Sequence, residues 1–166
     1  MTRPLIWALG VLGVTALSSL GAGQLVSRRA TPPETPMRAA GSGERVLVIA
    51  SDLRGHYMVH PNIGGARLRM LVDTGASFVA LTHEDALKAG LRTSSRDPVR
   101  RLATANGVVE ARSVRITEMS VGDIVVRDVE AVVMPPGSMG VSLLGMAFLR
   151  RLKGFEVSGG RLTLRG

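Results

Sequence analysis

The sequence predicts an all-β domain, either a barrel or a sandwich, rather than a parallel α/β sheet. Short runs of β-forming residues dominate the chain after residue 44, turn signals separate these runs, and only two segments have the pattern of a helix. The chain has 166 residues, of which 45% are hydrophobic and 3% aromatic. This length accommodates one ordinary domain.

Eight segments have the composition of β-strands, and glycines or polar turn residues separate several of them. Hairpin turns need residues that tolerate a positive φ, which glycine does best. The expected strands are Arg45–Ala50, His56–Ile63, Ala66–Val72, Phe78–Leu81, Val99–Ala103, Val108–Thr117, Ile124–Met134 and Arg161–Leu164. The expected hairpin turns are Gly64–Gly65, Asn106–Gly107, Gly122–Asp123 and Gly159–Gly160.

Two helices are expected to interrupt the strands. The first begins at Thr82, where Asp85 three residues later makes a near capping box, and it ends at Gly90. The second runs from about Ser142 to Leu152 and has apolar residues at positions 143, 144 and 147–149, before two arginines at 150 and 151. Both helices are short compared with the strand-rich remainder, which supports the all-β class.

A membrane segment is expected at the start of the chain. No charged residue lies between Pro4 and Ser27, and this apolar run of about 20 residues suffices to cross a bilayer as a helix. We interpret residues 1–29 as a membrane anchor, with a cleaved signal segment as the alternative. Residues 30–44 form a Pro- and Gly-rich linker, and residues 45–166 form the folded domain. Arginines on both sides of the run leave the topology open.

Composition excludes several classes of function. The chain has no cysteine, which excludes a disulfide scaffold, thiolate metal sites and a cysteine nucleophile. Its formal net charge is +8, but residues 46–166 carry sixteen basic and eleven acidic side chains, which a solvated arginine-rich surface explains. Without stacking aromatics or a basic recognition helix, we expect no nucleic-acid partner. His56 and His60 are four residues apart without a third ligand, so we expect no metal.

One segment, residues 70–81, has a pattern typical of a catalytic carboxylate. Asp73 ends an apolar strand and is followed by the hydroxyl of Thr74 and by Gly75. A carboxylate in apolar surroundings is costly to desolvate unless backbone N–H groups and a hydroxyl satisfy it, and a turn through Gly75 can present such donors. A simple surface turn is the alternative. We favour a functional carboxylate because apolar residues flank the turn on both sides.

At these residues the chain resembles the retropepsin-like aspartic proteases, in particular bacterial single-domain members with a membrane anchor. Three features in the family's order carry the resemblance. They are the catalytic loop at residues 71–76 with Asp73, the tip of the flap hairpin at Thr104, Ala105, Asn106 and Gly107, and the second hydrophobic-hydrophobic-Gly motif at Leu143, Leu144 and Gly145. The resemblance implies a closed acid-protease barrel with one short and one C-terminal helix.

Two positions depart from the retroviral members of this family. Ser77 stands four residues after Asp73, where retroviral members have an acidic residue, and Met146 stands where they have a basic residue after the second-motif Gly145. Both partners of an internal ion pair are therefore absent together, which is compatible with the fold. Retroviral dimer contacts and substrate preferences are for this reason not transferred to this chain.

The resemblance implies an aspartic endopeptidase that needs no cofactor. The chain has one Asp-Thr-Gly sequence, so a homodimer has to supply the second carboxyl from Asp73 of another copy. Thr74 would brace the paired loops by hydrogen bonding. The backbone at Gly75 and Ala76 would orient the carboxylates.

The substrate is expected to be an extended segment of a protein, lying between the Asp pair and the flap and held by main-chain hydrogen bonds. Pocket walls are expected from Val79, Val133 and Leu143. The family suggests a single-pass protein of the bacterial inner membrane with its catalytic domain in the periplasm. The alternative function is a non-catalytic peptide-binding or oligomerisation domain at the membrane.

Overall fold

The computed structural model describes residues 43–104 and 107–166. Their strands are β1 (Val46–Ala50), β2 (Met58–Val59), β3 (Asn62–Ile63), β4 (Ala66–Arg67), β5 (Met70–Val72), β6 (Val79–Leu81), β7 (Val99–Thr104), β8 (Gly107–Val121), β9 (Ile124–Val133), β10 (Ser142–Leu144), β11 (Gly154–Ser158) and β12 (Arg161–Arg165). Their helices are α1 (His83–Lys88) and α2 (Met146–Leu149).

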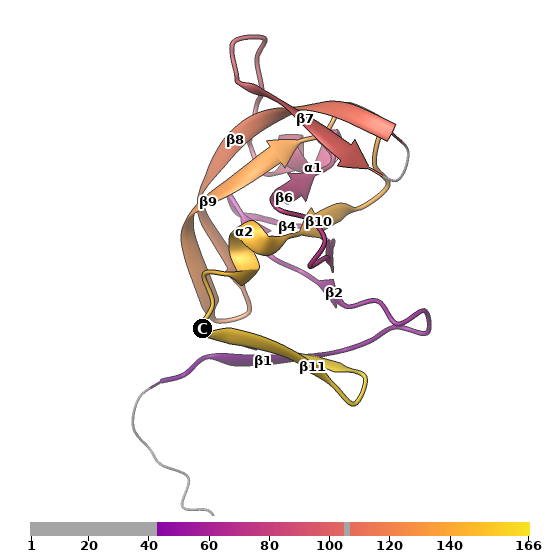
Figure 1. Cartoon of the computed structure of the whole chain (residues 1–166). Coiled ribbons are helices and arrows are strands. Elements are labelled where there is room, and N and C mark those ends of the chain that lie inside the picture. The colour runs from indigo at the N-terminus through magenta and orange to yellow at the C-terminus, as the bar shows by residue number, and fades with distance from the viewer. Residues whose placement is uncertain (1–42, 105–106) are drawn as a thin grey trace, which may run out of the picture. The chain divides into compact units, whose positions relative to one another are not determined.

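These strands form two sheets, so the all-β prediction is confirmed. The larger sheet has the order β2-β5-β10-β6-β9-β8-β3-β4, with β7 paired to β8, and it curls into a half-barrel (Figure 1). The strands at its two ends, β2 and β4, do not pair with each other in the described chain. The expected closed barrel is therefore replaced by an open, strongly curved sheet. The smaller sheet has the order β1-β12-β11.

The expected membrane anchor, nearly all of the linker, and Ala105 and Asn106 of the expected flap tip lie outside the described residues. In the two ranges that are described, no helix is long and apolar enough to span a membrane.

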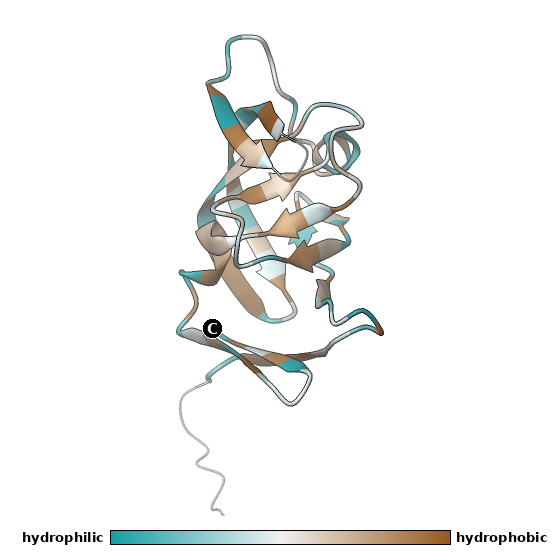
Figure 2. Ribbon diagram, turned by 45° about the vertical axis from the view of Figure 1, so that its right-hand side comes forward, coloured by the Kyte–Doolittle hydropathy of each residue, from teal (hydrophilic) through white to brown (hydrophobic). Residues whose placement is uncertain are grey.

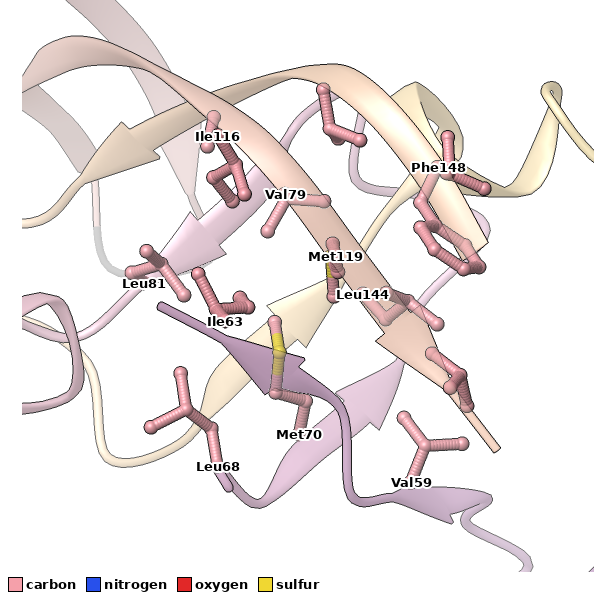
Figure 3. Close-up of a cluster of buried hydrophobic side chains, with 14 of the residues drawn as sticks. Val59, Ile63, Leu68, Met70, Val79, Leu81, Ile116, Met119, Leu144 and Phe148 are labelled. Carbon is pink, nitrogen blue, oxygen red and sulfur yellow. The ribbon is translucent and has the colours of Figure 1, made fainter. Parts of the chain in front are cut away.

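The core lies in the hollow of the curled sheet. Buried and exposed residues alternate along much of the long strands β8 and β9, so that one face of each strand points into the core. Figure 2 colours the strands by the hydropathy of their residues. Side chains from most strands and from α2 meet there (Figure 3); the fully buried ones include Ile63, Met70, Val79, Ile116, Met119, Leu144 and Phe148. A second, smaller cluster consists of Ala80, Ala111, Val132 and Met134.

Two expected strands, 56–63 and 66–72, are each broken into two short ones. Pro61 lies in the first break; it has no N–H to donate to a ladder, and its carbonyl accepts the N–H of Leu68 in the second break at 2.9 Å. The hairpin between them turns at Gly64 and Gly65, both with positive φ, as predicted.

The prediction of a helix from Ser142 to Leu152 is wrong in its first part. Ser142–Leu144 is strand β10, parallel to β5 and antiparallel to β6, and the helix is limited to Met146–Leu149. A short apolar run is compatible with a helix or with a buried strand. This run forms a strand because it pairs with β5 on one side and with β6 on the other.

Strand β11 was not predicted, although its turn was. Gly159 and Gly160 have φ of +54° and +70° and join β11 to β12. In this hairpin Phe155 faces Leu164 and Val157 faces Leu162. The strand escaped prediction because only two apolar residues alternate along it, which is too short a pattern to be distinctive.

Candidate active site

The two motifs that are far apart in the sequence meet at one end of the larger sheet. Strands β5 and β10 run parallel, with Leu143 beside Leu71 and Leu144 beside Val72. Asp73, the first residue after β5, donates its N–H to the carbonyl of Leu144 at 3.1 Å and so extends the ladder by one bond. The end of β10 therefore positions the Asp73 loop.

Gly145 allows this close approach. A Cβ at this position would lie 2.1 Å from the carbonyl oxygen of Phe78 and 2.6 Å from that of Ala76. The next residue, Met146, donates its N–H to the Ala76 oxygen at 2.8 Å. The second motif needs glycine for space, because its φ of −94° is open to any residue.

A tight turn presents the carboxylate of Asp73. Its Oδ1 accepts the N–H of Gly75 at 2.8 Å, and its backbone oxygen accepts the N–H of Ala76 at 3.3 Å. A Cβ on Gly75 would lie 3.1 Å from the same Oδ1, which is tighter than an ordinary contact. The backbone donor predicted for Asp73 is thus found. Thr74 is exposed, and its hydroxyl makes no hydrogen bond to any described residue.

Asp73 lies at the edge of a cleft of about 720 Å³. The walls come from the Asp73 loop and β6, from β7, from the end of β9 and from the loop that leads into β10. The lining consists of Asp73, Gly75, Ala76, Ser77, Phe78, Ala80, Arg101, Leu102, Ala103, Thr104, Val132, Met134, Ser138, Met139, Gly140 and Leu143. Two of these side chains are charged, Asp73 and Arg101, and Arg101 contacts Glu110 at 4.0 Å. The other side chains of the lining are mainly apolar.

Two of the three expected wall residues do not line this cleft. Val79 and Val133 are 0% and 4% exposed and belong to the main core. Their neighbours Ala80 and Val132 line the cleft instead, because consecutive residues of a strand point to opposite faces. Leu143 lines the cleft as predicted.

The expected flap is the hairpin of β7 and β8, both labelled in the upper part of Figure 1 below the loop that leads into β7. Leu102 pairs with Val109 and Thr104 with Gly107. The hydroxyl of Thr104 donates to the Gly107 carbonyl at 2.8 Å, at the end of the described part of the hairpin. Thr104 also lines the cleft.

The histidines and Leu144 lie outside the cleft lining. His56 is exposed and contacts Asp52 at 3.5 Å, and among the described residues no cluster of three potential ligands could hold a metal ion. Leu144 is fully buried in the main core, so its contribution to the site is the backbone carbonyl that binds Asp73.

Sequence reasoning missed several residues of the cleft. Met134 and Met139 come from the end of β9 and the loop before β10, where no periodic pattern marks them. Phe78 was predicted only as the start of a strand. Its aromatic type directly after the Asp73 loop was the available signal.

Comparison with known proteins agrees with this geometry. The family described as "gag-polyprotein putative aspartyl protease" matches residues 59–151. The chain is similar to an uncharacterized protein from the cobV 5′ region of Sinorhizobium sp., 39% identical over 123 residues, and to the uncharacterized protein RP867 of Rickettsia prowazekii (strain Madrid E), 33% identical over 118 residues. These alignments cover 74% and 71% of this chain. They cover 53% and 50% of the relatives, so the chain spans about half the length of the curated relatives it matches.

Among solved structures, the chain is similar to the crystal structure of a retropepsin-like aspartic protease from Rickettsia conorii. The TM-score is 0.66 at 31% sequence identity, and the match covers 74% of this chain and 92% of that one. The fold, the order of the motifs and the family match over residues 59–151 agree. The chain belongs to the retropepsin-like aspartic protease family.

Proposed function

We propose that the protein is an aspartic endopeptidase that hydrolyses peptide bonds in an extended segment of a protein substrate. The position of Asp73 carries this proposal: its carboxylate accepts the Gly75 N–H and lines a cleft whose other side chains are mainly apolar. In the described chain β7 pairs with β8 alone, which leaves one edge of the flap strand for main-chain hydrogen bonds to substrate.

The chemistry needs two carboxyls, and each chain supplies one Asp-Thr-Gly loop. One carboxylate takes a proton from water, which attacks the carbonyl carbon, while the other carboxyl protonates the carbonyl oxygen and later the leaving nitrogen. Two carboxyls about 3 Å apart share one proton and titrate as a pair. The second carboxyl comes from Asp73 of a second protomer across a two-fold axis. The free hydroxyl of Thr74 is then available to the partner loop.

An uncovered part of the smaller sheet supports association with a second copy. Phe155 and Val157 lie on the same face as Leu164 and Leu162, which are buried in the core. Even so, Phe155 is 36% and Val157 58% exposed, and within the described residues β11 pairs with β12 alone. A second copy can cover these apolar side chains and pair with the open edge.

We further propose that residues 1–29 anchor the protein in the bacterial inner membrane, with the folded domain in the periplasm. The uncharged apolar run between Pro4 and Ser27 supports an anchor. Anchoring confines two copies to one plane and raises their effective concentration, which favours the dimer.

The test is peptide-library cleavage by the full chain in detergent, across pH, for the wild type and for Asp73→Asn. We expect the wild type to cleave with a bell-shaped pH profile and Asp73→Asn to lose cleavage while keeping its circular dichroism spectrum and its mass in solution. Asp123→Asn, an exposed acid in the β8–β9 turn, is the matched control and keeps full activity.

Cleavage by Asp73→Asn at the wild-type rate would show that this carboxyl is not catalytic. If neither protein cleaves but both bind the same peptides, the alternative of a non-catalytic peptide-binding domain is correct.

A further inference from the structure

Arg100 is held in one orientation beside the cleft by two independent contacts. Its guanidinium carbon lies 4.6 Å from the centre of the Phe78 ring. Its Nε donates to the hydroxyl of Ser113, on the neighbouring strand β8, at 3.0 Å. A stacked and hydrogen-bonded guanidinium is pre-organised, so it loses little conformational entropy when it binds an anion.

The charge of Arg100 is not offset by an acidic side chain. Among the described residues it forms no ion pair, and no protein group occupies its two terminal nitrogens. Arg115, on the adjacent strand, differs in this respect, because it contacts Asp128 at 2.8 Å and Glu130 at 3.5 Å. Arg100 therefore offers an unused pair of donors in the geometry that a carboxylate accepts.

The place of Arg100 connects it to the substrate cleft. Phe78 lines the cleft together with Asp73, and it also lines a neighbouring hollow of about 210 Å³ together with Arg100 and Ser113. Leu102, two residues further along β7 and hence on the same face of the strand, lines the cleft itself. The Phe78 ring is therefore shared by the cleft and by the hollow that Arg100 lines, and a substrate chain that leaves the cleft over this ring would enter that hollow.

We propose that Arg100 is a specificity-determining residue that binds an acidic side chain of the substrate, beyond the residues next to the scissile bond. This inference rests on the proposed peptidase function. Glu130 lines the same hollow, but it contacts Arg115 at 3.5 Å and forms no ion pair with Arg100 among the described residues. Arg100 is thus the arginine of this hollow without an acidic partner there. In a two-fold symmetric dimer one Arg100 stands on each side of the scissile bond. Glu or Asp is then favoured at symmetric positions on both sides of the cut.

The experiment uses the full chain and a library of extended peptides in which Glu or Gln occupies each position in turn. We expect the wild type to prefer Glu at one distal position on each side. In Arg100→Gln the value of kcat/KM for the Glu peptide falls about tenfold, mainly through KM, the size expected for one charged hydrogen bond. Cleavage of the matching Gln peptide stays unchanged. Arg100→Lys keeps part of the preference, because it retains charge without the planar fork.

Arg127→Gln is the matched control, since it removes one arginine that pairs with Glu118 on the exposed face of β8 and β9. It should leave the preference for Glu unchanged. A wild type without preference for Glu overturns the proposal, as does an Arg100→Gln variant that slows Glu and Gln peptides equally.

Binding separates this proposal from the peptidase proposal. The same peptides, labelled with a fluorophore, are titrated with Asp73→Asn and with Asp73→Asn/Arg100→Gln, and their affinities are measured by anisotropy. Tighter binding of Glu peptides that depends on Arg100 supports the specificity role even if the wild type cleaves nothing. Equal affinities of both chains for Glu and Gln peptides contradict it.

Discussion

The hydroxyl of Ser142 donates to the carboxylate of Asp85 at 2.7 Å and accepts the N–H of Thr82 at 3.0 Å. Asp85 in turn donates its own N–H to the Thr82 hydroxyl at 3.1 Å, so Thr82 caps α1 as predicted. In a capping box the acidic side chain would accept the backbone N–H of the cap residue directly. Here the Ser142 hydroxyl bridges the Thr82 N–H and the Asp85 carboxylate. These bonds connect the start of α1 to β10, the strand that positions the Asp73 loop.

Replacing Ser142 with Ala should destabilise the fold by about 1–3 kcal/mol, because it leaves the N–H of Thr82 without its partner in a buried setting. The midpoint of urea unfolding measures this loss. Ser158→Ala, at an exposed position of β11, should leave the midpoint unchanged. An equal midpoint for Ser142→Ala and wild type would mean that the bridge does not contribute to stability.

Replacing Gly145 with Ala should be far more damaging, since the new Cβ would lie 2.1 Å from the Phe78 carbonyl and neither backbone can yield without breaking the sheet. We expect the free energy of unfolding to fall by about 3 kcal/mol or more, and the proposed peptidase activity to be lost. Thermal unfolding and cleavage are measured side by side. Gly140→Ala, where nothing lies within 4 Å of the added atom, is the control and should unfold at the wild-type temperature.

Replacing Val157 with Asp should weaken the proposed dimer, because a charge would replace an apolar side chain that a second copy would cover. The measurement is mass in solution against protein concentration, in parallel with peptide cleavage. Activity should fall at low concentration and recover at high concentration. Val125→Asp, 39% exposed on β9, tests whether any surface charge has this effect. Unchanged association of Val157→Asp would place the interface elsewhere.

The turn after β1 should respond to acid. The N–H of His56 donates to the carboxylate of Asp52 at 2.8 Å and is the largest cause of a pKa below the ordinary value for this carboxyl. A lowered pKa in the folded state means that the stabilisation is complete above the ordinary carboxyl pKa and is lost as pH falls through the lowered pKa. Backbone amide shifts of Arg54 and His56 in an NMR titration report this midpoint. In Asp52→Asn these amides should not titrate; a midpoint at or above the ordinary value contradicts the prediction.

Much of the site could be predicted from short stretches of sequence. The Asp73 turn, the cap at Thr82 and the paired glycines at residues 64–65 and 159–160 depend on contacts between residues a few positions apart. Such contacts are encoded by residue type and spacing alone, because glycine tolerates positive φ and short polar side chains bind nearby N–H groups. The carboxylate that the proposed chemistry needs was identified in this way.

Pairing between distant segments decided the rest. Whether Val79 or Ala80 faces the cleft depends on the register of β6 against β9, and a shift of one residue would exchange them. The assignment of Ser142–Leu144 to a strand depends on β5 and β6 on either side of it. The stack of Arg100 on Phe78 joins β7 to the residue before β6. Local sequence determined the chemistry of single side chains, whereas only the tertiary structure decided which of them share a face or a cavity, since long-range strand pairing has no signature within a short window of residues.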